Sequence, residues 1–427
     1  MSRYYRMEMN GISGQASNKN GSLNNIMNQA LRSLRLKLSA VRNAEVAKRP
    51  LILQLGKTAD RKVLSALMRQ RAVRQVSDDY PEQLRELFAI EHPKLVYQPD
   101  FEASFQDYLR SQSGKKDLME QGNWVYYPWL STLVHLLPER DFQRVRTARN
   151  RHLITEVEQK LYYDAVVGIA GLSVGNSVIL AIVLQGGAKR IRLADFDRLA
   201  LSNLNRIRAG VESLGLEKVL MTARQIYALN PYASLELYGE GLTEKNIKDF
   251  FSAKPKLTLL IDELDNIAMK YLIREHARKN HLPVIMGADN GDNVVVDIER
   301  YDLNSKTPFF HGRLGRVNYQ MLKNLDKFGI GRTITRHIGP ENVTERMQQS
   351  LLDMGRGIVS WPQLGGAALL NGSALAYCAR KIATAQPVEK KRSLISLDAA
   401  LDPQYTGNAA KRRRRRIVKD FKKLFGL

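Results

Sequence analysis

The sequence has a single cysteine, Cys378, among its 427 residues. One thiol excludes an internal disulfide framework, and it excludes a structural zinc site built from four cysteines. No apolar run approaches the roughly 18–20 residues that a membrane-spanning helix needs. The N-terminal stretch MSRYYRMEMNG lacks the apolar core of a secretory signal. We therefore expect a cytoplasmic protein.

Acidic residues are scarce relative to basic ones. The chain has 66 Lys and Arg against 43 Asp and Glu, a formal net charge of +23. Residues 1–50 carry nine cations against two acids, and residues 411–427 carry nine against one. The two ends therefore hold more than half of the net charge. Solvated, flexible ends would explain this pattern, and so would attraction to nucleic acid, anionic lipid or an acidic protein.

Changes in composition and periodicity divide the chain into four parts. Residues 1–49 combine an Asn-, Ser- and Gly-rich segment, which favours disorder, with a basic amphipathic helix. Residues 50–140 predict a small N-terminal α/β domain. Residues 141–385 alternate apolar strands with helices, which predicts a doubly wound, mostly parallel sheet of Rossmann-like type. Residues 386–427 predict a linker and a polybasic tail, so we expect an α/β protein with flexible basic ends.

A glycine-containing loop follows the apolar strand at residues 165–169. In the usual G-x-G-x-x-G fingerprint, glycines let the backbone approach a phosphate, and the helix that follows offers unpaired N–H groups to it. Here the three fingerprint positions are Gly171, Ser173 and Asn176, and a further glycine, Gly175, comes one place early. A nucleotide-binding loop and a tight strand–helix turn without a ligand are both compatible with this pattern.

Acidic and basic side chains at the end of the next strand extend this pattern. Asp195 lies 24 residues after Gly171, an offset at which an acid typically binds a ribose hydroxyl. Asp197 follows, and then the stretch SNLNR, which contains Asn203 and Arg206. A nicotinamide oxidoreductase has no need of these last residues, whereas an enzyme that handles a triphosphate does, because arginine pairs with phosphate oxygens.

Two later features could belong to the same site. Lys218 begins the following helix, where it either reaches the phosphates or is an ordinary surface lysine. A later apolar strand runs into IDELDN, and Asp265 is placed to hold Mg²⁺, which prefers carboxylate oxygens and substrate phosphates. Asp262 in this stretch fits a structural role. The stretch GADNGDN, which contains Asp289 and Asp292, contacts substrate or metal, or forms a polar turn before a strand.

In this order, the strand with its glycine loop, the D-x-D pair, SNLNR, a lysine and a D-N at a later strand end resemble a known family. They are similar to the adenylating domain of the ThiF/MoeB/HesA family, in the ubiquitin-activating-enzyme superfamily, over about residues 145–300. The LNP ending of the lysine helix and the preceding stretch TARNRHLITEVEQKL also resemble it. The resemblance implies that an arginine of this stretch, Arg151, reaches the phosphates.

The resemblance implies an ATP- and Mg²⁺-dependent enzyme that adenylates a carboxylate and releases pyrophosphate. The carboxylate would be a protein or peptide C-terminus, such as that of a small ubiquitin-like protein, or a small acid. The resemblance also implies a homodimer. The catalytic residues that it implies are Arg151, Arg206, Lys218 and Asp265, with Asp265 as the Mg²⁺ ligand. Those that it implies for nucleotide binding are Gly171, Ser173, Gly175, Asn176, Asp195, Asp197, Asn203, Arg206 and Lys218.

The sequence departs from the family in one chemical respect. Many relatives carry paired C-x-x-C zinc ligands and a catalytic cysteine, whereas Cys378 lies in an apolar helix beyond the nucleotide motifs. The chemistry then ends at the acyl-adenylate, or an amine or thiol from another molecule attacks it. A non-catalytic nucleotide- or partner-binding module is the alternative, and an NAD-dependent oxidoreductase is a weaker one.

The basic run at residues 411–416 precedes an amphipathic turn. Such a segment suits anionic lipid or nucleic acid, and with lipid the protein would be membrane-peripheral.

Overall fold

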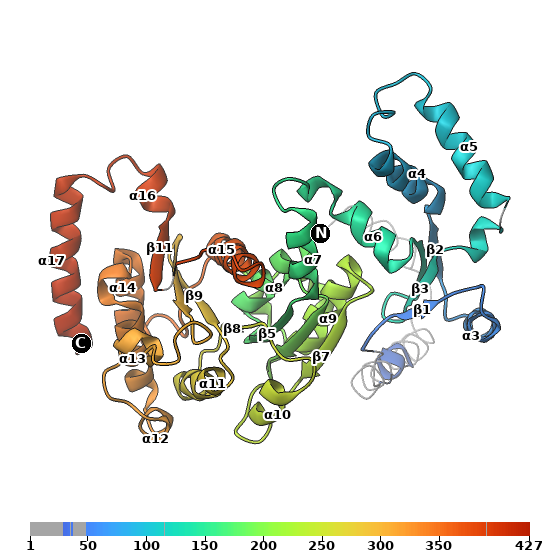
Figure 1. Ribbon diagram of the computed structural model, residues 1–427. Coiled ribbons are helices and arrows are strands. Elements are labelled where there is room, and N and C mark those ends of the chain that lie inside the picture. The colour runs from blue at the N-terminus through green and yellow to red at the C-terminus, as the bar shows by residue number, and fades with distance from the viewer. Residues whose placement is uncertain (1–28, 35, 37–47, 115, 390) are drawn as a thin grey trace, which may run out of the picture. The chain divides into compact units, whose positions relative to one another are not determined.

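The computed structural model describes residues 29–34, 36, 48–114, 116–389 and 391–427 (Figure 1). The chain divides into one unit of residues 1–48 with 128–130, and a second of residues 49–127 with 131–427. In the first unit, residues 29–34 and 36 are helical, and the rest of the predicted basic amphipathic helix lies outside the described residues. Across the described residues, no helix is long and apolar enough to cross a bilayer.

The second unit contains all the named strands and helices. The strands are β1 (Leu51–Leu53), β2 (Gln75–Asp78), β3 (Asn123–Tyr127), β4 (Thr132–Leu136), β5 (Val166–Ala170), β6 (Arg190–Ala194), β7 (Ser234–Tyr238), β8 (Leu259–Asp262), β9 (Val284–Asn290), β10 (Asn293–Glu299) and β11 (Arg392–Ser396). The α-helices are α3 (Thr58–Arg69), α4 (Tyr80–Glu91), α5 (Phe101–Ser113), α6 (Glu139–Arg146), α7 (Glu156–Asp164), α8 (Val174–Leu184), α9 (Lys218–Leu229), α10 (Ile247–Ser252), α11 (Ile267–Lys279), α12 (Tyr319–Lys323), α13 (Lys327–Ile338), α14 (Glu345–Asp353), α15 (Gly365–Ala383), α16 (Leu397–Leu401) and α17 (Asn408–Phe425).

The smaller of two sheets has four strands in the order β1-β3-β4-β2. Strand β2 runs parallel to β4, and the other pairs are antiparallel. This sheet lies wholly within residues 50–140. Its strand β3 is tied to the rest of the unit, because Asn123 Nδ2 donates to the Tyr232 hydroxyl at 2.9 Å.

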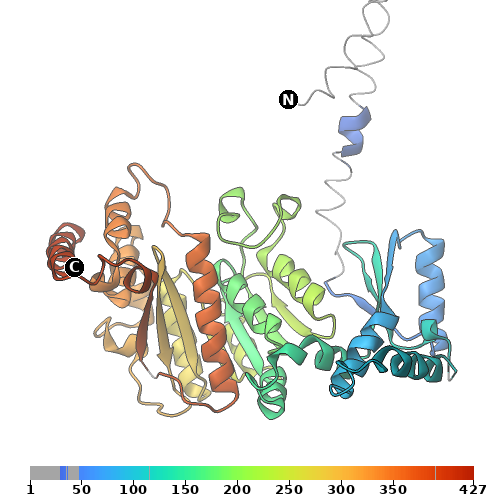
Figure 2. The same ribbon diagram turned by 90° about the horizontal axis from the view of Figure 1, so that it is seen from above.

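The larger sheet has seven strands in the order β11-β10-β9-β8-β5-β6-β7. Strands β5 to β9 are parallel, and β10 and β11 are antiparallel additions at one edge. Successive side chains of a strand point to opposite faces. In β5, Ile169 faces α8, while Ala170 joins a buried cluster with Phe250 of α10 and Ile273 of α11. Helices therefore cover both faces, as Figures 1 and 2 show, and the predicted doubly wound, mostly parallel α/β fold is confirmed.

The strand order reverses direction beside β5. From β5 the chain proceeds through β6 and β7 toward one edge, and then through β8 and β9 toward the other. Loops at the carboxyl ends of β5 and β8 thus diverge, which opens the crevice where doubly wound sheets bind ligands.

The prediction of a linker and flexible tail at residues 386–427 is wrong. Strand β11 is the edge strand of the larger sheet and pairs with β10 over five residues. Helix α17 packs on α14, with Phe421 only 2% exposed. The composition of this segment is polar, but β11 pairs with β10 through its backbone, and Phe421 and Phe425 of α17 pack against a buried cluster. The segment therefore completes the fold.

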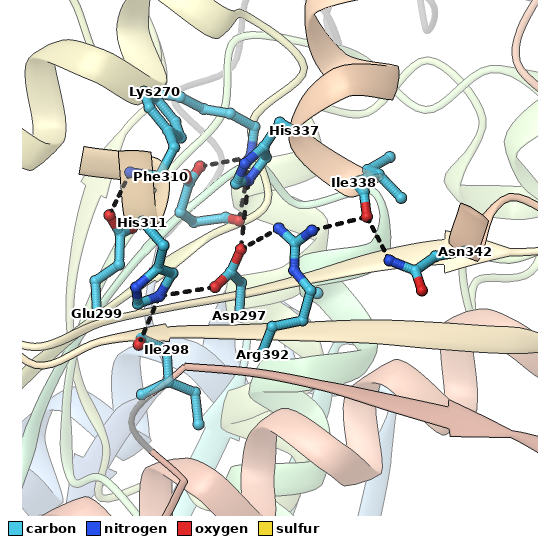
Figure 3. Close-up of polar contacts among 12 residues, drawn as sticks. Lys270, Asp297, Ile298, Glu299, Phe310, His311, His337, Ile338, Asn342 and Arg392 are labelled. Carbon is cyan, nitrogen blue, oxygen red and sulfur yellow. Dashed lines mark hydrogen bonds and ion pairs between the residues drawn. The ribbon is translucent and has the colours of Figure 1, made fainter. Parts of the chain in front are cut away.

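A buried ionic cluster fastens this segment to the sheet (Figure 3). Asp297 of β10 lies 3.0 Å from His311 Nε2, pairs with Arg392 of β11, and lies 3.7 Å from His337 of α13. Burial alone would raise the pKa of Asp297, but His311, Arg392 and His337 outweigh it and lower the pKa. Through Arg392 and His337, the Asp297 carboxylate joins β10, β11 and α13. Arg392 also donates to the Ile338 carbonyl of α13 at 2.7 Å.

A second buried cluster lies at the end of β8. Asp262 is fully buried and pairs with Lys270 at 3.0 Å and Arg274 at 2.6 Å, and Arg274 also reaches Glu299 at 2.6 Å. Burial would raise the pKa of Asp262, yet the two cations hold it below its usual value. The structural role predicted for Asp262 is confirmed.

Candidate nucleotide-binding site

The glycine loop crosses the chain that leaves β8. Gly171 has φ of +89°, and a Cβ there would lie 2.2 Å from the Glu263 carbonyl oxygen. Only glycine accommodates both the positive φ and this approach. A Cβ at Gly175 would lie 3.0 Å from the Ile169 side chain, so this residue lets α8 begin close to β5. The early glycine therefore supports close helix–strand packing.

The loop and the end of β6 meet through the Asp195 carboxylate. Leu172 N–H donates to Oδ2 at 2.6 Å, and Asp197 N–H donates to Oδ1 at 2.7 Å. Asp195 is 8% exposed, and burial raises its pKa while these two N–H groups oppose the rise. Each carboxylate oxygen can accept more than one hydrogen bond, so Asp195 can still accept hydroxyl groups in this position.

Lys218 and Asp197 form a pair at the start of α9. Lys218 Nζ lies 2.8 Å from Asp197 Oδ2, and the backbone N–H of Lys218 donates to the Asp197 carbonyl at 2.9 Å. The lysine side chain is almost fully buried, whereas the aspartate side chain is half exposed. The ammonium group is therefore held at the edge of the crevice by an acid that remains open to solvent.

Arg206 lies over the glycine loop. Its Nε donates to Ser173 Oγ at 3.1 Å, and Nη1 donates to Asn205 Oδ1 at 2.9 Å. Burial lowers the pKa of Arg206, and the charges of Asp265 and Asp289 act in the opposite direction. The hydrogen-bond partners of Arg206 thus come from the segments after β5 and β6, and Asp265 and Asp289 act on it electrostatically, without a direct carboxylate pair among the described residues.

Three predicted site residues make other contacts. Asn176 is fully buried and donates to Thr222 Oγ1 at 3.0 Å and to Gln225 of α9. Asn203 Oδ1 accepts from the backbone of its own turn at 3.0 Å. Arg151 pairs with Glu156 at 3.0 Å and is half exposed, and within the described residues it has no hydrogen bond or ion pair to the glycine loop.

Two further carboxyl groups lie at the same strand ends. Asp289 of β9, which the sequence left between a ligand contact and a polar turn, is 6% exposed. Burial raises its pKa to about 6, against the effects of Asn371 and Arg206. Glu263 accepts from Gly287 N–H at 3.0 Å, and burial raises its pKa well above its usual value. The sequence signal was available, because IDELDN and GADN both follow apolar strands, but burial distinguished these acids.

Asp265 is exposed beside these groups. In the part of the chain that the structure describes, no group of three or more His, Cys, Asp or Glu side chains could hold a metal ion. A single exposed carboxylate can bind Mg²⁺ where phosphate oxygens and water complete the shell of the ion. A cavity of about 510 Å³ adjoins the site, lined by Ser202 and Arg206 on one side and Ile358 and Trp361 on the other.

A parallel sheet with a glycine loop at its switch point and an acid ending the next strand defines a nucleotide-binding α/β domain of Rossmann-like type. Comparison with known families narrows this class. Residues 147–324 match the ThiF family, so the chain carries a ThiF family domain.

Curated relatives extend the comparison. The Mycobacterium tuberculosis protein named uncharacterized protein MT1398 is 34% identical over 67% of this chain and 39% of its own length. The sulfur carrier protein adenylyltransferase of Thermus thermophilus is 32% identical over 29% of this chain and 44% of its own. The chain thus spans less than half the length of these two relatives. The solved structure of Escherichia coli MccB with ATP covers 62% of this chain and 77% of its own, with a TM-score of 0.43 and 16% identity.

Proposed function

We propose that the chain is an ATP-dependent adenylyltransferase that activates a carboxylate as an acyl-adenylate and releases pyrophosphate. The observation that carries the proposal is the convergence of Asp195, Arg206 and Lys218 on one crevice around Gly171. Nucleotide and Mg²⁺, when bound, supply the adenylyl group and the metal charge for this chemistry.

The charges of the crevice suit a polyanion and its developing negative charge. Arg206 has N–H groups that can turn from Ser173 and Asn205 to phosphate oxygens, and bidentate pairing of this kind is strong. To bind a phosphate, Lys218 Nζ would leave Asp197 or contact both groups at once. Preorganised cations of this kind stabilise charge on the transferring phosphoryl group. Asp195 would hold the ribose hydroxyls.

Asp265 would hold Mg²⁺ through a carboxylate oxygen. Its position at the end of β8, within electrostatic range of Arg206, puts an anion next to the proposed phosphate site. Without a metal ion this anion would repel the triphosphate. The exposed carboxylate therefore makes better physical sense with a divalent cation than without one.

Asp289 would serve as a proton acceptor beside the acyl group. Its Oδ1 accepts from Asn371 Nδ2 at 3.0 Å, and its buried Oδ2 has no hydrogen-bond partner among the described residues. A carboxyl group with a pKa of about 6 accepts a proton near neutral pH. An amine that attacks the acyl-adenylate must lose a proton as the C–N bond forms and AMP leaves, and Asp289 Oδ2 could take it.

The carboxylate substrate would lie in the cavity between Arg206 and Trp361. A protein or peptide C-terminus, such as that of a small ubiquitin-like protein, fits the relative named as a sulfur carrier protein adenylyltransferase. A small carboxylate on another molecule fits the Escherichia coli relative named tRNA threonylcarbamoyladenosine dehydratase, which is 24% identical over 36% of this chain. We also propose a homodimer, as the family resemblance implies.

ATP–pyrophosphate exchange tests the proposal, with amino acids, small dicarboxylic acids and peptides ending in Gly-Gly as probes. Exchange should appear with at least one probe and fall at least tenfold in Asp265→Ala. Glu86→Ala, an exposed acid on α4 beside the smaller sheet, is the matched control and should leave exchange unchanged.

Calorimetric titration with MgATP and with NADH separates the alternatives. Binding of MgATP without exchange for any probe would favour the non-catalytic module. Binding of NADH in preference to MgATP would overturn the nucleotide assignment and favour an oxidoreductase. Exchange that is indifferent to Asp265 would remove its metal role.

A further inference from the structure

Helix α17 is held on the protein by its apolar side. Phe421 is buried in a cluster with Val343 and Met347, and Phe425 packs against the same cluster. At the first half of the helix, Arg413 pairs with Glu345 of α14 at 2.7 Å. The helix is therefore a docked element of the fold, and its two phenylalanines contact the protein core.

The opposite side of α17 is a stripe of exposed cations. Lys411, Arg415, Lys419 and Lys422 follow one another at intervals of three or four residues, which places them on one face. The whole set, here called the cationic stripe, is Lys411, Arg412, Arg415, Arg416, Lys419, Lys422 and Lys423. Across the described residues, none of these seven has a carboxylate within ion-pair distance. The helix therefore fixes an array of positive charge in which Asp420 is the one acid.

Helix α13 carries exposed arginines, one of which adjoins the end of α17. Arg332 and Arg336 of that helix are exposed. A Cβ at Gly426, which follows α17, would lie 3.6 Å from Arg332 Cδ, so the two helices adjoin there. Figures 1 and 2 show α17 on the outer side of α14, with nothing drawn over its far side.

The docking of α17 distinguishes between the polyanions that its charge suits. Stable attachment of an amphipathic helix to a membrane uses a buried apolar face together with basic residues. Here the apolar face contacts the protein core, and Leu424 is the large apolar residue of the helix that stays exposed. A nucleic acid needs no apolar face, because phosphate contacts from Lys and Arg supply its sequence-independent affinity. An 18-residue helix is about 27 Å long and can follow several successive phosphates.

We propose that the cationic stripe of α17 binds the phosphate backbone of a nucleic acid. This binding does not depend on the proposed adenylyltransferase activity, because the stripe and the crevice share no residue. The surface would bring a nucleic acid, or a molecule carried on one, to the protein that bears the nucleotide site. Recognition would be of charge spacing rather than of base sequence.

Fluorescence anisotropy with the full chain tests this surface, using fluorescein-labelled 20-nucleotide single-stranded RNA and a 20-base-pair DNA duplex as probes. The variant replaces Arg412, Arg415, Arg416 and Lys419 with Gln. The matched control replaces Lys245, Lys248, Lys254 and Lys256 with Gln, four exposed lysines around α10, so both proteins have the same net charge. Thermal unfolding and MgATP titration of both check that the fold and the crevice persist.

At 100 mM salt we expect at least a tenfold loss of affinity in the stripe variant and less than a twofold change in the control. The slope of log affinity against log salt should also fall by about 2–4 for the duplex. Equal losses of affinity in both variants would show that net charge alone determines binding, and would overturn the proposal. Loss of binding to vesicles with 30% phosphatidylserine, with unchanged nucleic-acid affinity, would assign the surface to membranes instead.

Discussion

Carboxylates of two kinds lie on neighbouring strands of the larger sheet. Asp262 on β8 and Asp297 on β10 are buried against cations, and their pKa values are lowered. Asp195 after β6 and Asp289 on β9 are almost as deeply buried, but burial raises their pKa values. Asp262 and Asp297 are neutralised by cations of the chain itself, whereas burial dominates at Asp195 and Asp289.

The difference separates structural from functional charge. Buried acids form ion pairs with Lys270, Arg274 and Arg392. A nucleotide could bind these cations only if the pairs were lost and the fold destabilised. Arg206 has only neutral hydrogen-bond partners, and Lys218 pairs with an acid that is half exposed. Groups in a crevice that have a shifted pKa or lack an ion-pair partner are the better candidates for function. Four predictions break or sharpen this comparison.

The largest effect should come from removing a structural acid. Asp262→Ala leaves Lys270 and Arg274 buried without their shared partner, which should lower the free energy of unfolding by about 3–5 kcal/mol. Urea denaturation measures this. Asp302→Ala, which breaks the pair with Arg300 near the surface, is the control and should cost about 1 kcal/mol or less. A small decrease in the free energy of unfolding of Asp262→Ala would mean that water or Glu299 compensates the cations.

A functional cation should show the opposite behaviour. Arg206→Ala should leave the unfolding free energy within about 1 kcal/mol, because only neutral partners are lost. MgATP affinity should fall about 10–100-fold, since charged hydrogen bonds to phosphate are worth about 1.5–3 kcal/mol. Calorimetric titration measures this, with Arg198→Ala, an exposed arginine after β6, as the control. Unchanged affinity would exclude Arg206 from the phosphate site.

The sequence predicted the central part of this comparison. Gly171 and Asp195 follow strand ends, and Arg206 and Lys218 lie on the segment that leads from β6 to α9. Alternation of apolar strands with helices brings such segments to one edge of a sheet. It did not predict that β11 and α17 complete the fold, because their apolar residues are few and their long-range partners are far away in sequence. Nor could composition reveal that an acid such as Asp289 is buried, since burial depends on tertiary packing.

Ionisation of Asp289, a proposed functional acid, should lower the free energy of unfolding. The folded-state pKa of Asp289, about 6, lies above its ordinary 3.8, so the folded protein binds this proton more tightly than the unfolded chain. Its stabilising contribution is complete below about pH 4 and is lost as the pH rises through 6. Asp289→Asn cannot ionise, and its amide can still accept from Asn371. Urea denaturation should show the variant about 3 kcal/mol more stable than wild type at pH 8 and equal to it near pH 4.

The opposite result, a variant less stable at pH 8, would mean that ionised Asp289 has a compensating partner. Asp297→Asn is the contrasting test, because the pKa of Asp297 is lowered. Its stabilisation is present at neutral pH and is lost only as the pH falls below the ordinary range of Asp, so this variant should be destabilised at pH 8.

The smallest effect should come from Arg151, which the family resemblance places at the phosphates. In the structure its partner is Glu156, and surface pairs of this kind contribute little. If one chain binds the nucleotide alone, Arg151→Ala should change MgATP affinity less than twofold, in contrast to Arg206→Ala. A loss as large as that of Arg206 would place Arg151 at the phosphates. Because the chain itself directs this side chain to Glu156, that result would require either a rearrangement of the segment before α7 or a second copy. Measuring affinity across the dissociation range of the proposed dimer would then distinguish the two.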